Sequence, residues 1–139
     1  MDRVFVDTSA WYEFADQRAA AHEVVSALID EHRGRMITST FVLAELTALV
    51  VARFDHRLAV TVDDSIRGSS DVELLHPVAA EEEEAWDLFR ARPDKSYSLT
   101  DCLSFVIMRR TGVDTALSAD QHFKQEGFQT LPLTPASRM

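Results

Sequence analysis

The sequence has little cysteine, glycine or proline. Cys102 is the only cysteine among 139 residues, which excludes an internal disulfide and a cysteine-based zinc site and suits a reducing compartment. Four glycines and four prolines argue against long disordered or low-complexity segments. A chain of this length and composition predicts one domain over residues 1–139, large enough to bury a core.

Long hydrophobic runs are also missing. The longest apolar stretch, residues 41–52, is interrupted by Glu45 and Thr47 and is too short to cross a bilayer. Only three apolar residues follow Met1-Asp2-Arg3, too few for a signal peptide. We therefore expect a cytoplasmic location.

Positive charge is scarce. The chain has 14 Lys and Arg against 23 Asp and Glu, a net charge of −9. This balance argues against non-specific nucleic-acid binding through a basic surface, but not against a nuclease whose acids face metal ions. The five histidines form no close pair with ligand spacing, so a histidine-based zinc site is not supported.

Short apolar segments alternate with longer stretches of helical periodicity, which predicts an α/β fold with a central parallel sheet and helices on both faces. Five segments are predicted strands: Arg3–Asp7, Met36–Ser39, Val72–Leu75, Thr115–Ser118 and Gln129–Leu133. Seven segments are predicted helices: Ser9–Gln17, Ala19–His32, Thr40–Phe54, Leu58–Ser69, Ala79–Arg90, Ser98 to just before Gly112, and Asp120–Gln125. The tail that follows, with Pro132 and Pro135, is predicted to be loose.

Two acids occupy positions where an isolated carboxylate is unusual. Asp7 ends the first apolar strand, where it is either a helix cap or part of a site beyond the strand end. Glu45 lies in the helix predicted for Thr40–Phe54, which is apolar nearly all round and is therefore expected to be largely buried. The carboxylate of Glu45 then needs an arginine partner or a metal ion, or its side chain must extend to solvent at the edge of the helix.

Two further acids lie at predicted helix starts. Asp101 stands three residues after Ser98, the spacing of a capping box, and Asp120 follows a strand where it too is a possible N-cap. In an α/β sheet these positions converge with Asp7 at one edge. Clustered carboxylates repel one another, and a hard divalent cation such as Mg²⁺ or Mn²⁺ offsets that repulsion.

Three hydroxyl residues accompany the acids in sequence. Thr8, Ser9 and Thr100 either orient the carboxylates and ligated water or are ordinary turn hydroxyls.

Four segments of the chain resemble the motifs of PIN-domain ribonucleases and, within them, the VapC toxins of prokaryotic toxin–antitoxin pairs. They are residues 4–11, 38–46, 98–105 and 116–123, in the family's order and over essentially the whole chain. The resemblance implies a PIN-like three-layer α/β/α sandwich with a short central parallel sheet of four to five strands. Ser118 stands where the fourth motif often has threonine, which keeps the hydroxyl.

The resemblance also implies a function. The chain would be a Mg²⁺- or Mn²⁺-dependent endoribonuclease, the toxin of a type II toxin–antitoxin system, using metal-activated water to leave a 5′-phosphate and a 3′-hydroxyl. One or two ions would be bound by four catalytic acids: Asp7, Glu45, Asp101 and Asp120. The implied partners are a structured RNA such as tRNA or rRNA, a cognate VapB-type antitoxin and a second copy of the chain.

An RNA substrate would need local positive charge. Eight basic residues are either candidate RNA contacts or solvated helix faces: Arg53, Arg57, Arg67, Arg90, Arg92, Lys95, Arg109 and Arg110.

Two other functions are compatible with the residues. One is a PIN-fold interaction module without catalysis. The other is a phosphatase or phosphoacceptor domain that uses Asp7 covalently. It is disfavoured because Ser9 stands where the haloacid-dehalogenase pattern needs an acid. A receiver domain needs a paired acid near the start and a later lysine, and Lys95 and Lys124 do not stand at clear strand ends.

Overall fold

The computed structural model describes residues 2–131. Within them the chain forms five strands: β1 (Val4–Val6), β2 (Met36–Ser39), β3 (Val72–Leu75), β4 (Thr115–Leu117) and β5 (Gln129–Leu131). The same residues form seven helices: α1 (Thr8–Ala15), α2 (His22–Glu31), α3 (Thr40–Arg53), α4 (His56–Arg67), α5 (Ala79–Ala91), α6 (Leu99–Thr111) and α7 (His122–Gln125). Every predicted element is present, but the end of the predicted fifth strand and the loose tail lie outside the described residues.

The five strands form one parallel sheet in the order β3-β2-β1-β4-β5, with β1 in the middle. All three residues of β1 are buried, since a central strand of a parallel sheet is covered on both faces. The chain runs outward from β1 to β3 and then crosses back to β4, so the strand order reverses between β1 and β4.

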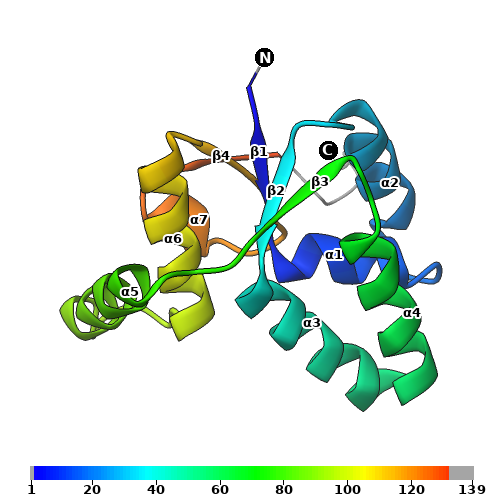
Figure 1. Cartoon of the computed structure of the whole chain (residues 1–139), viewed down its shortest axis with the longest axis horizontal. Coiled ribbons are helices and arrows are strands. Elements are labelled where there is room, and N and C mark those ends of the chain that lie inside the picture. Colours follow the sequence, from blue (N-terminus) through cyan, green and yellow to red (C-terminus); the bar gives the residue numbers. More distant parts are fainter. Residues whose placement is uncertain (1, 132–139) are drawn as a thin grey trace.

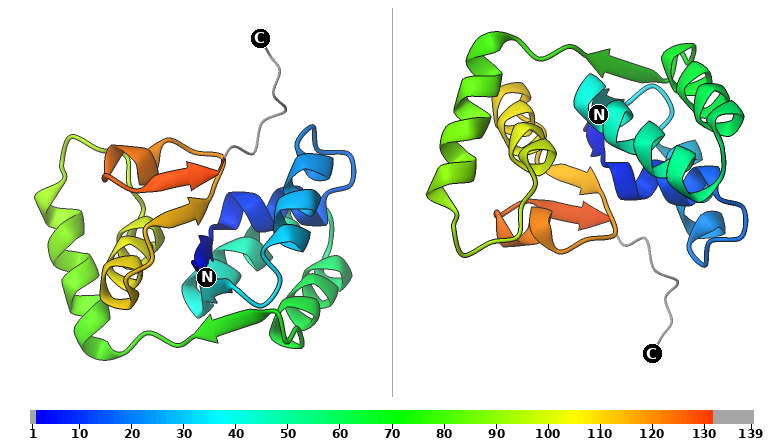
Figure 2. Two further views of the ribbon diagram at one scale, coloured as in Figure 1. Left: turned by 90° about the horizontal axis from the view of Figure 1, so that it is seen from above. Right: turned by 90° about the horizontal axis from the view of Figure 1, so that it is seen from below.

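Helices cover both faces of the sheet, which confirms the predicted three-layer α/β/α architecture. Helices α1, α2, α3 and α4 pack together on one side, and α5, α6 and α7 pack on the other (Figures 1 and 2). Right-handed crossovers explain the division, because the connections that run outward and those that run back must pass on opposite faces. None of the helices in residues 2–131 is long and apolar enough to span a membrane.

The core on the second side is built from aromatic rings of α6 and α7. Phe105 and Phe123 are fully buried, with ring centroids 5.0 Å apart and nearly perpendicular planes. Phe5 of β1 lies 6.3 Å from Phe123, so this cluster fixes α7 against the middle of the sheet. Eight consecutive residues of α6, from Asp101 to Met108, are buried.

Helix α3 differs from its prediction. Val42, Leu43 and Leu46 are buried, but Ala44 and Val51 are exposed. A sequence that is apolar nearly all round predicted a largely buried helix, and that prediction is wrong, because four of the 14 residues of α3 are buried. The outer side of α3 is apolar without being covered by residues 2–131.

Two helices start later than predicted. Helix α2 begins at His22 rather than Ala19, since the preceding segment forms turns in which Asp16 accepts a hydrogen bond from the Arg18 N–H. Helix α7 begins at His122 rather than Asp120 for a similar reason, described below.

Candidate functional site

The site lies at the carboxyl ends of β1 and β4, where the strand order reverses. This is the position at which open α/β sheets bind ligands. Asp7 follows β1 directly, and its N–H donates to the Leu117 carbonyl at the end of β4 across 3.1 Å. Asp101 at the start of α6 and Asp120 after β4 approach the same edge.

Asp7 is almost completely enclosed, with 2% of its surface exposed. Its Oδ2 accepts hydrogen bonds from the hydroxyls of Ser118, at 2.9 Å, and Ser9, at 3.1 Å. The residue occupies the N-cap position of α1, yet its side chain makes no capping hydrogen bond. The helix-cap alternative therefore does not account for the carboxylate.

Asp101 caps helix α6 and also contacts His122. Its N–H donates to Ser98 Oγ and its Oδ2 accepts from the Ser98 N–H, both at 3.0 Å, which is the predicted capping box. The same Oδ2 lies 2.8 Å from Nδ1 of His122. Only 6% of Asp101 is exposed, so the capping role does not remove it from the buried cluster.

Asp120 lies in the turn before α7. Its Oδ1 accepts from the His122 N–H at 3.0 Å, a local turn that delays the helix start, and the N-cap position is Gln121. Its own N–H donates to Ser118 Oγ at 3.3 Å. Asp120 is half-buried and closer to solvent than Asp7 and Asp101.

The three aspartates are electrostatically coupled. Burial raises the pKa of Asp7 to about 7, and the charges of Asp120 and Asp101 add to the rise. Burial and the charge of Asp101 also raise the pKa of Asp120. Buried carboxyl groups whose charges interact in this way are costly to ionise together unless a cation neutralises them.

Glu45 is joined to this cluster indirectly. Its Oε1 accepts a 2.6 Å hydrogen bond from Thr8 Oγ1, and Thr8 is the neighbour of Asp7. Glu45 is half-buried and has no ion pair within residues 2–131, so the buried salt bridge offered as an alternative is absent there.

The hydroxyls divide into two kinds. Those of Thr8 and Ser9 hold carboxylates, as one of the two sequence alternatives expects, and Ser118 joins them by binding Asp7. Among residues 2–131 the hydroxyl of Thr100 makes no hydrogen bond.

His122 is a site residue that the sequence did not reveal. It lies between Asp101 and Asp120, and one atom from each of the three falls within 4.8 Å of the others, a spacing compatible with a metal ion. His122 has no second histidine at ligand spacing, and its carboxylate partner Asp101 is 21 residues away in sequence. Local spacing therefore did not identify it.

These donors fit a hard divalent cation. The acids supply carboxylate oxygens, the ligands that Mg²⁺ and Mn²⁺ prefer. The pKa of Asp7 is raised first by burial and then by the charges of Asp120 and Asp101, and a bound cation would offset both effects. The residues described here therefore match the chemistry expected of a metal centre.

Most of the basic residues considered for RNA contact are paired with acids. Arg92 and Arg109 both bind the buried Glu126, and Arg67, Arg90 and Arg110 pair with Asp63, Asp87 and Glu84. Lys95 lies 3.7 Å from Asp94, and Arg53 stacks over the ring of Tyr12. Within residues 2–131, Arg57 has no carboxylate partner, so little of the predicted basic charge is free.

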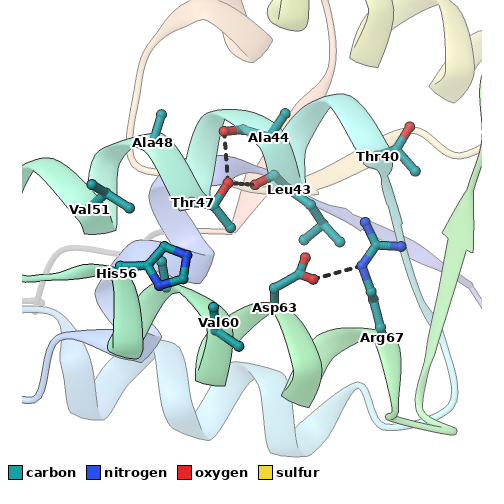
Figure 3. Close-up of a pocket in the computed structure, with 11 residues that line it drawn as sticks. Thr40, Leu43, Ala44, Thr47, Ala48, Val51, His56, Val60, Asp63 and Arg67 are labelled. Atoms are coloured by element: carbon teal, nitrogen blue, oxygen red, sulfur yellow. Dashed lines mark hydrogen bonds and ion pairs between the residues drawn. The ribbon is translucent and has the colours of Figure 1, made fainter.

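A pocket of about 680 Å³ lies elsewhere, between α3 and α4. Figure 3 shows the side chains of Val51 and Val60 beside it, and none of the four acids lines it. It includes the uncovered apolar side of α3.

The chain has clear relatives. It is 34% identical over 125 residues to the 23S rRNA-specific endonuclease VapC20 of Mycobacterium tuberculosis, covering 90% of this chain and 95% of the relative. It is 30% identical over 121 residues to ribonuclease VapC26 of the same species, covering 86% and 89%.

Solved structures of VapC proteins are also similar to this chain. The crystal structure of M. tuberculosis VapC20, described as a sarcin-ricin loop cleaving toxin, superposes with a TM-score of 0.85 at 34% identity over 90% of this chain and 95% of the other. A DNA-bound VapBC structure from Salmonella typhimurium shares the fold alone, with a TM-score of 0.71 at 13% identity over 96% and 99%. The PIN domain family matches residues 4–128. The chain therefore belongs to the PIN domain family and is of the VapC type within it.

Proposed function

We propose that the chain is an endoribonuclease toxin that depends on Mg²⁺ or Mn²⁺. The observation that carries the proposal is the coupling of Asp7, Asp101 and Asp120 at the switch point of the sheet, with the pKa of Asp7 raised to about 7. Relatives named as an rRNA-specific endonuclease and a ribonuclease support a nuclease. No observation favours a phosphoacceptor, since Asp7 is enclosed by serine hydroxyls.

The acids would share the binding of one or two ions. A divalent ion bound there would neutralise the scissile phosphate and generate a hydroxide nucleophile at neutral pH. Ser9 and Ser118 bind Asp7, the Ser98 N–H binds Asp101, and Thr8 binds Glu45, so these three carboxylates are held in position by hydrogen bonds.

The proposed substrate is a structured RNA, with rRNA favoured over tRNA. VapC20 is named for 23S rRNA and for the sarcin-ricin loop, and it is similar to this chain over nearly its whole length. A protein of net charge −9 whose arginines are mostly paired has little capacity for random RNA, so recognition by shape is the expected mode. We also propose a cytoplasmic location, where such a substrate is found.

We also propose a VapB-type antitoxin and a homodimer. The pocket between α3 and α4 supports a protein partner, because it is lined by Ala44, Ala48 and Val51 of α3 and by Val60 of α4 (Figure 3). Val78, Trp86 and Phe89 expose a second apolar surface at α5. Both surfaces suit apolar contacts with another chain.

The proposed activity is tested with a 23S rRNA fragment that contains the sarcin-ricin loop. We expect cleavage with Mg²⁺ or Mn²⁺, none with EDTA, and a new 5′-phosphate end. Asp101→Asn should reduce the rate at least about a hundredfold because it removes a charged ligand, whereas Glu83→Gln, a change of an exposed acid on α5, should leave it unchanged.

Three results would contradict the proposal. They are cleavage in EDTA, equal cleavage by Asp101→Asn and wild type, and no cleavage of any RNA by protein that binds the metal. The last of these would favour the non-catalytic interaction module instead.

A further inference from the structure

Both ring nitrogens of His122 are engaged by side chains of the chain itself. Nδ1 lies 2.8 Å from Asp101 Oδ2 and 3.9 Å from Asp120 Oδ1, and Nε2 lies 3.1 Å from Ser96 Oγ. The ring therefore bridges the carboxylate at the start of α6 and the loop that precedes this helix.

The short contact with Asp101 determines which atom donates. An ionised carboxylate oxygen only accepts hydrogen bonds, so with Asp101 ionised the 2.8 Å contact assigns the proton to Nδ1 of His122. A protonated ring nitrogen has no lone pair for a metal ion. The spacing of Asp101, Asp120 and His122 is thus compatible with a metal ion, but the hydrogen bonding uses Nδ1 for another purpose.

The same contact distinguishes the two oxygens of Asp101. Oδ2 accepts from both the Ser98 N–H and His122 Nδ1. No residue between 2 and 131 donates to Oδ1. His122 therefore completes the hydrogen bonding of one oxygen and leaves the other available to a cation.

The ring itself is held in place. Tyr97 packs edge-on against it with centroids 5.4 Å apart, and the Tyr97 hydroxyl donates to the buried Glu126 at 3.0 Å. The backbone N–H of His122 also donates to Asp120 Oδ1 at 3.0 Å. One residue thus contacts two of the acids, through its ring and through its main chain.

We infer that His122 is a positioning residue for the metal centre and not a metal ligand. Its Nδ1–H orients Asp101 so that Oδ1 faces the ion, in the way that outer hydrogen-bond partners orient carboxylate ligands. This inference rests on the proposed function for the ion, but it concerns a residue outside the four acids. A direct imidazole ligand would instead favour Zn²⁺ or Ni²⁺ over Mg²⁺.

Mn²⁺ binding without RNA tests the inference by isothermal titration calorimetry. His122→Ala removes the donor and should weaken Mn²⁺ binding about 10–100-fold. His122→Asn places an amide N–H near the position of Nδ1 and should recover most of that loss. His76→Ala changes an exposed histidine away from the acids and should bind as wild type does.

Two results would overturn the inference: wild-type affinity in His122→Ala, or the same loss in His122→Asn as in His122→Ala. Nitrogen NMR of the wild-type ring gives a second measurement that needs no variant. We expect Nδ1 to keep its proton when Mg²⁺ is added. A coordination shift at either ring nitrogen would show a direct ligand instead.

RNA cleavage separates this inference from the proposed function. A wild-type chain that binds Mn²⁺ and shows the expected histidine effects, but cleaves no RNA, would contradict the nuclease and leave the role of His122 intact. A wild-type chain that binds no Mn²⁺ would overturn the inference.

Discussion

Asp7 is the residue at which burial and charge conflict most directly. Its carboxyl group is enclosed beside two other aspartates, and its pKa rises to about 7. Because folding raises the pKa of this carboxyl group, the folded state is favoured while Asp7 is protonated. That contribution to the free energy of unfolding is present at low pH and is lost as pH rises through 7. A metal ion would remove this cost and permit three ionised aspartates side by side.

Replacing Asp7 with asparagine should therefore stabilise the metal-free protein at high pH. The difference in unfolding free energy between Asp7→Asn and wild type should grow by roughly 2–3 kcal/mol from pH 5 to pH 8, because only the wild type ionises a buried carboxyl. Urea unfolding in EDTA measures it, with Glu83→Gln as control. A difference that stays constant over this range would contradict the assignment of the raised pKa.

Thr8 tests whether Glu45 belongs to the site. Thr8→Val removes the 2.6 Å hydrogen bond to Glu45 while keeping the shape of the side chain, and it should slow RNA cleavage about 10–100-fold. Thr47→Val is the matched control on α3, since its hydroxyl bonds only main-chain carbonyls. If both variants cleave at the wild-type rate, Glu45 does not depend on Thr8.

At the level of single residues, strand ends and helix starts predicted which acids would come together. Asp7, Asp101 and Asp120 follow from local signals, because the carboxyl ends of parallel strands share one edge. His122 could not be predicted, since its contact with Asp101 depends on how the loop around Ser96 folds back on α7.

At the level of elements, one buried acid connects three segments on the second side of the sheet. Glu126, the residue after α7, has a side chain only 4% exposed. It accepts hydrogen bonds from Arg92 after α5, Arg109 of α6 and Tyr97 of the intervening loop. Burial raises its pKa, but these three donors lower it further than burial raises it, so the pKa lies below its usual value.

Glu126→Gln should destabilise the fold by roughly 1–3 kcal/mol at pH 7, because it removes charge-assisted hydrogen bonds to two arginines that are partly screened by solvent. A lowered pKa gives stability that is present above pH 4.5 and is lost as pH falls below it, so the difference from wild type should shrink at pH 3. Chemical unfolding at the two pH values measures this.

The exposed pair of Arg3 and Glu73 provides the control for Glu126. Glu73→Gln should change stability by less than about 1 kcal/mol, as is usual for surface ion pairs. An equal effect of Glu73→Gln and Glu126→Gln would show that burial of Glu126 contributes nothing.

The order of the helices and strands along the chain was predictable, but which side of a helix is exposed was not. Apolar periodicity identified every strand and helix. The outer side of α3 carries Ala44, Ala48 and Val51, and the polar residues beside them, Thr40 and Thr47, have no charge that would signal exposure. Apolar residues that contact another chain have the same sequence pattern as apolar residues in a core, so the pattern alone does not distinguish them.

At the level of the whole molecule, a small number of the 23 Asp and Glu residues form the candidate site. The net charge of −9 gives no hint of a nuclease, yet three acids converge at the one place where the strand order reverses. The order β3-β2-β1-β4-β5 itself is beyond local sequence signals, because it depends on which face each crossover takes.

The most direct test of the account is a Mn²⁺ titration of the wild type and four single variants, followed by calorimetry. We predict one or two ions bound by the wild type and weaker binding in Asp7→Asn, Glu45→Gln, Asp101→Asn and Asp120→Asn, with Glu83→Gln as the unaffected control. Wild-type affinity in all four variants, or no binding by the wild type, would contradict a shared metal centre at the end of β1.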